Sequence, residues 1–196
     1  MCTDTLPAPL NKLEKEATIF RKLECGERLF TQNGTTGGLF YLISGTIELK
    51  RTTVAGHSVT IHRARGGDTF AEASLFTDKY HCTGTTATEV KLIECARQPI
   101  LQLLRTDIDF AFNITSRFAA QIQESRRQVE LLSIRAADER VIAAIEDGLL
   151  TEDIVTFADI IGLAPETVYR ALAQLTEQGR IQKAARGQYK LKARAQ

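Results

Sequence analysis

The sequence predicts an α+β protein in three successive parts: an N-terminal jelly-roll-like β-barrel, a long dimerisation helix and a C-terminal winged helix-turn-helix domain. Three observations predict this order. Glycines punctuate short apolar runs over residues 18–95, apolar residues repeat at heptad spacing over residues 108–132, and a helix–Gly–helix pattern precedes a basic hairpin. The expected boundaries are 1–107, 108–134 (the helix and a hinge) and 135–196.

The totals limit the classes of protein. A length of 196 residues suits one large domain or two small ones. The net charge is only +1, so any basic surface must be local. No run of about 18 apolar residues occurs, and the N-terminal segment lacks the apolar core of a signal peptide. We therefore expect a cytoplasmic protein with no membrane partner.

Residues 18–95 have the texture of β-structure. Runs such as GLFYLISG and TIELKR alternate with glycine turns at strand-length intervals, and the turn at Gly45 is the clearest of them. Such spacing is typical of a jelly roll or barrel rather than of alternating βαβ units.

Residues 108–132 predict one long helix. Positions that step by 4, 3, 4, 3, 4 and 3 form an a/d seam: Ala111, Thr115, Phe118, Ile122, Ser125, Val129 and Leu132. Two interpretations stay open, and both can be true because they concern different faces of the helix. One is packing on the chain's own β domain, and the other is a parallel coiled coil that makes a homodimer. The dimer is favoured if the chain reads DNA, because paired half-sites require two-fold symmetry. Its interface is then Phe118, Ile122, Ser125, Val129 and Leu132.

A hinge is expected at residues 133–136, followed by a helix over residues 138–146. Residues 156–178 then predict two short helices joined at residues 162–163, as in helix-turn-helix DNA readers. Thr156 with Asp159 predicts a capping box at the start of the first. An ordinary helical hairpin of an unrelated domain is the alternative, because helix–Gly–helix alone is a weak pattern.

The second of these helices has separate faces. Pro165 suits its first position and Gly179 its end. Apolar residues at 3.6 spacing must face a core: Val168, Leu172 and Leu175. The residues left outside near the N-terminal end are Glu166, Tyr169 and Arg170. A recognition helix presents this end to base edges, where a carboxylate accepts from cytosine N4 and a guanidinium grips guanine O6 and N7.

Two short basic strands around a glycine turn follow and predict a wing. Its expected DNA contacts are Lys183, Arg186 and Lys190. From residue 163 onward two acidic residues face seven basic ones, which are Arg170, Arg180, Lys183, Arg186, Lys190, Lys192 and Arg194. This excess is expected of a phosphate-contacting surface, so double-stranded DNA is the expected partner.

Four motifs follow one another along the chain: GERLFTQNGTTGGLFYLISGTIEL, GGDTFAEASLF, IRAADERVIAAI and APETVYRAL. In this order they resemble the β-roll signature, phosphate-binding cassette, first DNA-domain helix and recognition helix of the CRP/FNR family of bacterial transcription regulators. The resemblance implies a homodimer on an inverted repeat, with RNA polymerase as a possible further partner. It implies base reading by Glu166 and Arg170, a phosphate contact at Thr167 and half-site tuning at Tyr169.

The resemblance also implies an effector pocket. In members that bind cyclic AMP, a glutamate takes the ribose 2′-hydroxyl and a later arginine neutralises the phosphate. Here Glu72 keeps the glutamate, but Cys82 stands at the arginine's position. A thiol cannot pair with a phosphate as a guanidinium does, so weak cyclic nucleotide binding is expected. The implied pocket is Glu72, Ala73, Ser74, His81, Cys82, Thr83, Ser125 and Arg126.

The cysteines lack metal-type spacing: Cys2, Cys25, Cys82 and Cys95. Cys25 and Cys95 are expected to be small buried core residues. Cys82 leaves two interpretations open, a buried residue or a redox sensor whose pKa is lowered beside His81. No cofactor is identified, and no metal site is expected.

The leading hypothesis is a dimeric, sequence-specific regulator with an effector pocket altered from the cyclic-AMP pattern. The alternatives are a small-molecule or cyclic-nucleotide binding module, or a thiol-based redox sensor that controls DNA binding. The sequence contains no P-loop, no nucleophile elbow and no metal-ligand pair at helical spacing. We therefore expect no catalytic residues and no enzyme activity.

Overall fold

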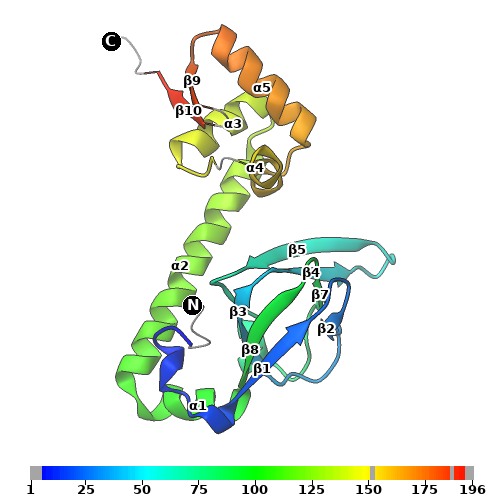
Figure 1. Cartoon of the computed structure of the whole chain (residues 1–196), viewed down its shortest axis with the longest axis vertical. Coiled ribbons are helices and arrows are strands. Elements are labelled where there is room, and N and C mark those ends of the chain that lie inside the picture. Colours follow the sequence, from blue (N-terminus) through cyan, green and yellow to red (C-terminus); the bar gives the residue numbers. More distant parts are fainter. Residues whose placement is uncertain (1–5, 151–152, 186–187, 193–196) are drawn as a thin grey trace. The chain divides into compact units, whose positions relative to one another are not determined.

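Alternating apolar residues build two four-stranded antiparallel sheets in the first half of the chain (Figure 1). The computed structural model describes residues 6–150, 153–185 and 188–192. One sheet has the order β1 (Thr18–Leu23), β8 (Val90–Ala96), β3 (Gly38–Ser44) and β6 (Thr69–Phe70). The other has the order β2 (Arg28–Phe30), β7 (Thr83–Thr86), β4 (Thr46–Thr52) and β5 (Ser58–Arg65). The expected α+β class is confirmed, but the sheets form an open roll rather than a closed barrel.

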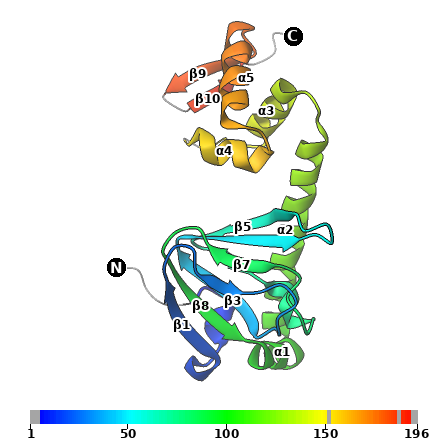
Figure 2. The ribbon, with the colours of Figure 1, turned by 90° about the vertical axis from the view of Figure 1, so that its right-hand side faces the viewer.

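The core of the roll lies between the two sheets, which face each other in Figure 2. Phe40 and Leu42 of β3 meet Ile47 and Leu49 of β4, all of them buried. The two strands are joined at Gly45, whose φ of 92° is left-handed, and a Cβ there would lie 2.3 Å from the carbonyl oxygen of Glu89. Gly45 therefore permits the predicted hairpin where a side chain would clash.

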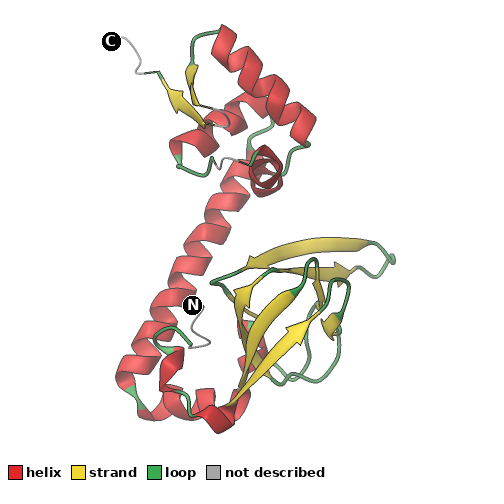
Figure 3. Cartoon of the chain, in the orientation of Figure 1, coloured by secondary structure: helices red, strands yellow, loops and turns green. Residues whose placement is uncertain are grey.

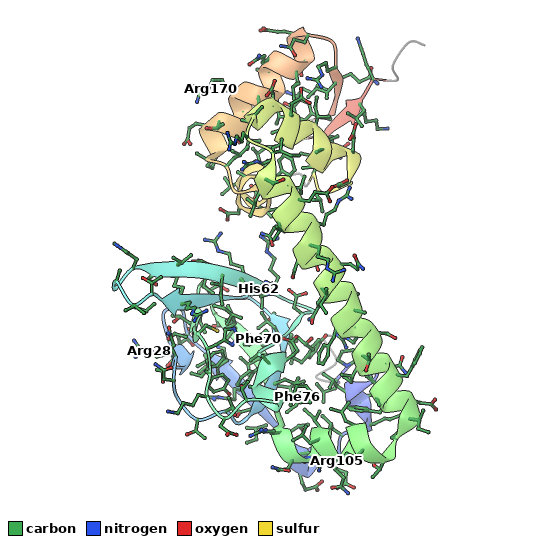
Figure 4. All side chains as sticks on the ribbon, turned by 180° about the vertical axis from the view of Figure 1, so that it is seen from behind. Arg28, His62, Phe70, Phe76, Arg105 and Arg170 are labelled. Carbon is green, nitrogen blue, oxygen red and sulfur yellow. The ribbon has the colours of Figure 1, made fainter. Side chains whose placement is uncertain are left out.

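A column of aromatic rings fills part of this core. The ring of Tyr80 stacks on Phe30 at 4.1 Å between centroids, Phe30 on Phe40 at 5.6 Å, and Phe40 on Phe70 at 5.2 Å. Phe70 lies inside the roll (Figure 4). Such stacks bury large apolar areas and hold the two sheets together.

Short helices and turns surround the roll in sequence. They are the 3-10 helices η1 (Leu10–Lys12), η2 (Lys15–Ala17) and η3 (Glu72–Leu75), and the helix α1 (Arg97–Thr106). The long helix α2 (Ile108–Ser133) follows, as the heptad pattern predicts. Among the described residues, no helix combines the length and apolarity needed to cross a membrane.

The chain divides into two compact units inside α2, whereas the sequence treated this helix as a separate part. We call Met1–Thr115 the N-terminal unit and Ser116–Gln196 the C-terminal unit. Strands dominate the first unit and helices the second (Figure 3). In the N-terminal unit α2 buries Phe110 and Ile114, and in the C-terminal unit it buries Leu131.

The C-terminal unit contains α3 (Ala137–Glu146), α4 (Ile154–Ile161), α5 (Pro165–Glu177) and an antiparallel pair, β9 (Ile181–Ala185) and β10 (Gln188–Leu191). Val168, Leu172 and Leu175 are at most 1% exposed and share one core with Phe157 and Val141. The predicted helix pair, its buried face and the hairpin after it are thus all present.

The expected capping box at Thr156 is wrong, because the N-cap of α4 lies three residues earlier. Asp153 is the N-cap, and its carboxylate accepts from the amides of Val155 at 3.2 Å and Thr156 at 3.0 Å. An aspartate that satisfies two free amides of the first turn sets the start of the helix upstream. Thr156 therefore lies within the helix.

Candidate nucleic-acid interface and effector pocket

The outer face of α5 carries the predicted base-reading residues. Pro165 occupies the first turn, and the N-cap Ala164 makes no side-chain hydrogen bond. Glu166, Tyr169 and Arg170 are exposed, and Tyr169 keeps 56% of its surface accessible. Arg170 projects from the outer side of the helix within its unit (Figure 4).

Thr167 is half-buried, and its amide donates to the carbonyl oxygen of Ala164 at 2.9 Å. The following amide, of Val168, donates to the same oxygen at 3.1 Å. These bonds satisfy part of the first turn without a capping side chain. The three exposed residues thus stand on a helix end whose backbone is fixed.

The ladder of the wing separates its two lysines. Lys183 on β9 lies opposite Tyr189, and Lys190 on β10 lies opposite Gln182. Directly paired residues of an antiparallel ladder share a face, so the two lysines lie on opposite faces of the hairpin. Both are exposed. Arg186 falls outside the described residues.

Arg180 is one of the seven basic residues from residue 163 onward, but among the described residues it is bound to a carboxylate, unlike these two lysines. Its Nη1 lies 2.6 Å from Oε1 of Glu139 and its Nη2 lies 3.1 Å from Oε2. This hydrogen-bonded pair raises the pKa of Arg180. Because Glu139 belongs to α3 and Arg180 precedes β9, the pair fixes the start of the wing.

The predicted cassette surrounds η3 in the N-terminal unit. Ala71 adopts a left-handed φ of 62° just before it. The hydroxyl of Ser74 is buried and donates to the carbonyl of Gly38 on β3. Glu72 is half-buried and Ala73 is exposed. The cassette therefore holds its turn through a buried bond to the neighbouring strand.

At the position expected to neutralise a phosphate, the structure places a buried thiol. Cys82 is 2% exposed within the apolar core that includes Phe30 and Tyr80. Burial raises the pKa of Cys82 and outweighs the opposing effect of Arg51. His81 beside it is exposed, and the Thr83 hydroxyl accepts from the amide of Gln32 at 3.0 Å.

These features correct part of the cysteine interpretation. A lowered pKa at Cys82 is wrong, and the buried-core interpretation is favoured because a desolvated thiol stays protonated. Cys95 is fully buried as expected, and burial raises its pKa to about 12. Cys25 is exposed rather than buried, and its thiol donates to the carbonyl of Ala87 at 3.1 Å. Cys2 lies outside the described residues.

The second half of α2 exposes an apolar stripe. Ile122, Val129 and Leu132 are 51%, 68% and 45% exposed, and Phe118 is half-buried. Ser125 lies between them and is exposed, as is Arg126. These last two belong to the C-terminal unit, whereas the other expected pocket residues belong to the N-terminal unit.

Sequence reasoning missed three residues that organise these sites. The Tyr80 hydroxyl accepts from the amide of Gly37 at 3.2 Å, while its ring closes the aromatic column. Glu139 holds the wing through Arg180. Arg140 donates to backbone carbonyls of two other helix ends. A lone tyrosine or an adjacent Glu–Arg pair has no periodicity that would single it out.

The comparisons with known proteins agree with this arrangement of parts. Residues 20–107 match the cyclic nucleotide-binding domain family. A Cyclic AMP receptor protein of Thermus thermophilus is 28% identical over 163 residues, which cover 79% of this chain and 75% of that protein. A Global nitrogen regulator of Nostoc is 23% identical over an alignment of 200 positions. The match covers 92% of this chain and 84% of that protein.

Among solved structures, FixK2 from Bradyrhizobium japonicum has a TM-score of 0.65 and 19% identity, with 90% of this chain and 93% of that chain covered. The likeness to FixK2 shows the fold.

Proposed function

We propose that the chain is a transcription regulator of the CRP/FNR type, a dimeric, sequence-specific DNA-binding protein that recognises an inverted repeat. Its match to the cyclic nucleotide-binding domain family and its 28% identity to a Cyclic AMP receptor protein support this proposal. Its effector pocket departs from the cyclic-AMP pattern.

The observation that carries this proposal is the division of α5 into two faces. One face is locked into the core through Val168 and Leu172, and the other presents Glu166 and Arg170 to solvent near the N-terminal end. In the major groove, we expect Arg170 to grip a guanine and Glu166 to accept from a cytosine amino group. The exposed lysines of the wing then supply phosphate contacts that do not depend on sequence.

The stripe on α2 supports a dimer. Ile122 and Val129 are seven residues apart and both more than half exposed, which is costly for apolar side chains unless another surface covers them. A second copy of the same stripe in parallel covers them with identical residues. Two copies related by a two-fold axis also present two α5 helices, as an inverted repeat requires.

The thiol at position 82 supports a pocket that does not take cyclic AMP. A phosphate needs a cation or several donors in place of its water shell, whereas Cys82 offers a desolvated neutral thiol. We therefore expect that cyclic AMP at sub-millimolar concentration does not bind. An isothermal calorimetry titration with cyclic AMP should show no binding heat. An isotherm that reports tight binding would contradict this part of the proposal.

Selection of duplexes from a random pool tests the function as a whole. We expect the reduced, ligand-free protein to enrich an inverted repeat, and its affinity to fall steeply with salt. Parallel selections with oxidant and with cyclic AMP reveal whether either is required. Failure to enrich any sequence under all these conditions would contradict DNA recognition.

A further inference from the structure

Arg140 of α3 has an unusual set of partners, because within the described residues its side-chain hydrogen bonds all go to backbone carbonyls. Its Nε and Nη2 donate to Ile134 at 2.9 and 2.6 Å, and Nη2 also donates to Leu132 at 3.2 Å. Its Nη1 donates to Ile161 at 3.2 Å and to Gly162 at 3.4 Å. In the described part of the chain Arg140 forms no ion pair with a carboxylate.

These carbonyls belong to two helix ends. Leu132 and Ile134 are at the C-terminal end of α2, and Ile161 and Gly162 are at the C-terminal end of α4. Helix C-termini carry partial negative charge and unsatisfied carbonyls, so one planar guanidinium satisfies both ends at once. The segment where the sequence suggested a hinge is therefore tied to the turn of the helix-turn-helix.

Direct packing reinforces this link. A Cβ on Gly162 would lie 2.5 Å from Cδ2 of Leu132, so the turn rests on the last residue of the exposed stripe. Gly162 also has a left-handed φ of 63°, which suits glycine. The neighbouring Leu131 is 2% exposed and belongs to the same core as Ile161. The end of α2 and the turn before α5 thus form one packed assembly within the C-terminal unit.

We propose that Arg140 is a positioning residue for operator recognition, which fixes the helix-turn-helix on the end of α2 and thereby sets the spacing between the two DNA half-sites. This inference rests on the proposed function. Each added base pair rotates one half-site by about 35° around the DNA axis, since one turn holds about 10 base pairs. A dimer whose reading helices are fixed on the paired stripe cannot follow that rotation. Without the guanidinium only the apolar packing of Leu131 and Leu132 holds this link, so the helix-turn-helix follows the rotation more easily.

The test compares binding to operators of different spacing. Duplexes carry the selected half-sites at the selected spacing, or with one or two base pairs inserted, and a further duplex carries one half-site alone. We expect the unaltered protein to lose about 30-fold in affinity at two inserted base pairs, within the usual range of coupling between sites. Arg140→Met should lose less than about 3-fold, while its single half-site affinity and its base preference stay unchanged.

Arg135→Met is the matched control, because it removes the same charge from an exposed arginine of the same segment. It should keep the spacing profile of the unaltered protein even if all affinities fall. Gly162→Ala disturbs the same link from the other side, because its Cβ would meet Cδ2 of Leu132 and its left-handed φ strains alanine, and it should flatten the profile as Arg140→Met does. Arg140→Lys keeps the charge but not the fork and should give an intermediate profile.

Amide hydrogen exchange of the free protein tests the link without DNA. In Arg140→Met we expect faster exchange over residues 131–134, with unchanged protection at Leu172 and Leu175. An unaltered exchange pattern and an unaltered spacing profile in Arg140→Met and Gly162→Ala would overturn the proposal. If instead the unaltered protein enriches no inverted repeat, the proposed function fails. The exchange experiment then tests by itself whether Arg140 holds the end of α2 to the helix-turn-helix.

Discussion

Glu139 and Arg180 lie 41 residues apart in sequence and form a two-point ion pair, with Nη1–Oε1 at 2.6 Å and Nη2–Oε2 at 3.1 Å. The pair joins the first turn of α3 to the residue before the wing. The carbonyl of Arg180 also accepts from the amide of Lys192, so both strands of the wing meet at this residue. Arg180 therefore has a structural role at the base of the wing, and its guanidinium is occupied by Glu139 rather than available to a phosphate.

Glu139→Gln should release Arg180 for DNA. We expect affinity for non-specific duplex to rise and the slope of log affinity against log salt to steepen by up to about 0.9, because one more cation can neutralise a phosphate. The measurement is a salt titration with random-sequence duplex. Glu177→Gln is the control, since it removes the same charge from exposed α5 without freeing an arginine. Equal slopes for both variants would argue against a sequestered Arg180.

Arg170→Ala should lower affinity for the selected operator by about 1–3 kcal/mol and relax the preference at one base position. The loss follows from removing two hydrogen bonds to one guanine edge. Affinities for a panel of single-base operator variants measure it. Lys190→Ala is the comparison, because it should weaken all operators alike. Retention of both affinity and preference by Arg170→Ala would show that α5 is not the reading helix.

Val129→Asp should break the dimer. A carboxylate placed at a position that is 68% exposed in one chain leaves that chain folded, but repels its symmetry mate across the stripe. We expect the dimer dissociation constant to rise at least about tenfold, a change of about 1.4 kcal/mol. Sedimentation velocity measures it, with the neighbouring exposed Gln128→Asp as the control. A dimer that survives Val129→Asp would place the interface elsewhere.

The cysteines should differ sharply in reactivity. Cys25 is exposed, whereas Cys82 is buried with a raised pKa, and the thiolate is the form that reacts. Brief alkylation of the native protein at neutral pH, read by peptide mass spectrometry, should label Cys25 first and Cys82 only in denaturant. Labelling of Cys82 at the rate of Cys25 would restore the redox-sensor interpretation.

Stability should fall at alkaline pH through Cys95. Its pKa is raised from 9.0 to about 12 in the folded protein, so the native state holds this proton more tightly than the unfolded chain. The corresponding stability is complete below the ordinary pKa and is lost as pH rises from 9.0 towards about 12. Urea unfolding over this range measures it. Cys95→Ala should flatten the decline despite lower overall stability, and the exposed Cys25→Ala should leave the decline unchanged.

Local patterns in the sequence predicted the strand-rich first half, the helices α2, α3 and α5 and the buried face of α5, but not the helix α1 or the start of α4. Apolar residues at 3.6 spacing determine which side of α5 is buried, because helical geometry alone puts Val168, Leu172 and Leu175 together. The heptad pattern likewise predicts α2 to within one residue at its end. Gly45 marks a turn because only its backbone accepts that conformation without a clash.

Contacts between residues distant in sequence were decided only by the tertiary structure. It determined that Cys82 is buried, that Glu139 binds Arg180, and that Arg140 joins the ends of α2 and α4. The same side chains occur on many solvated surfaces, and composition does not distinguish them. Periodicity reports which face of an element meets a core, whereas the partner of a charged or polar group depends on which other elements the packed core brings within hydrogen-bond distance.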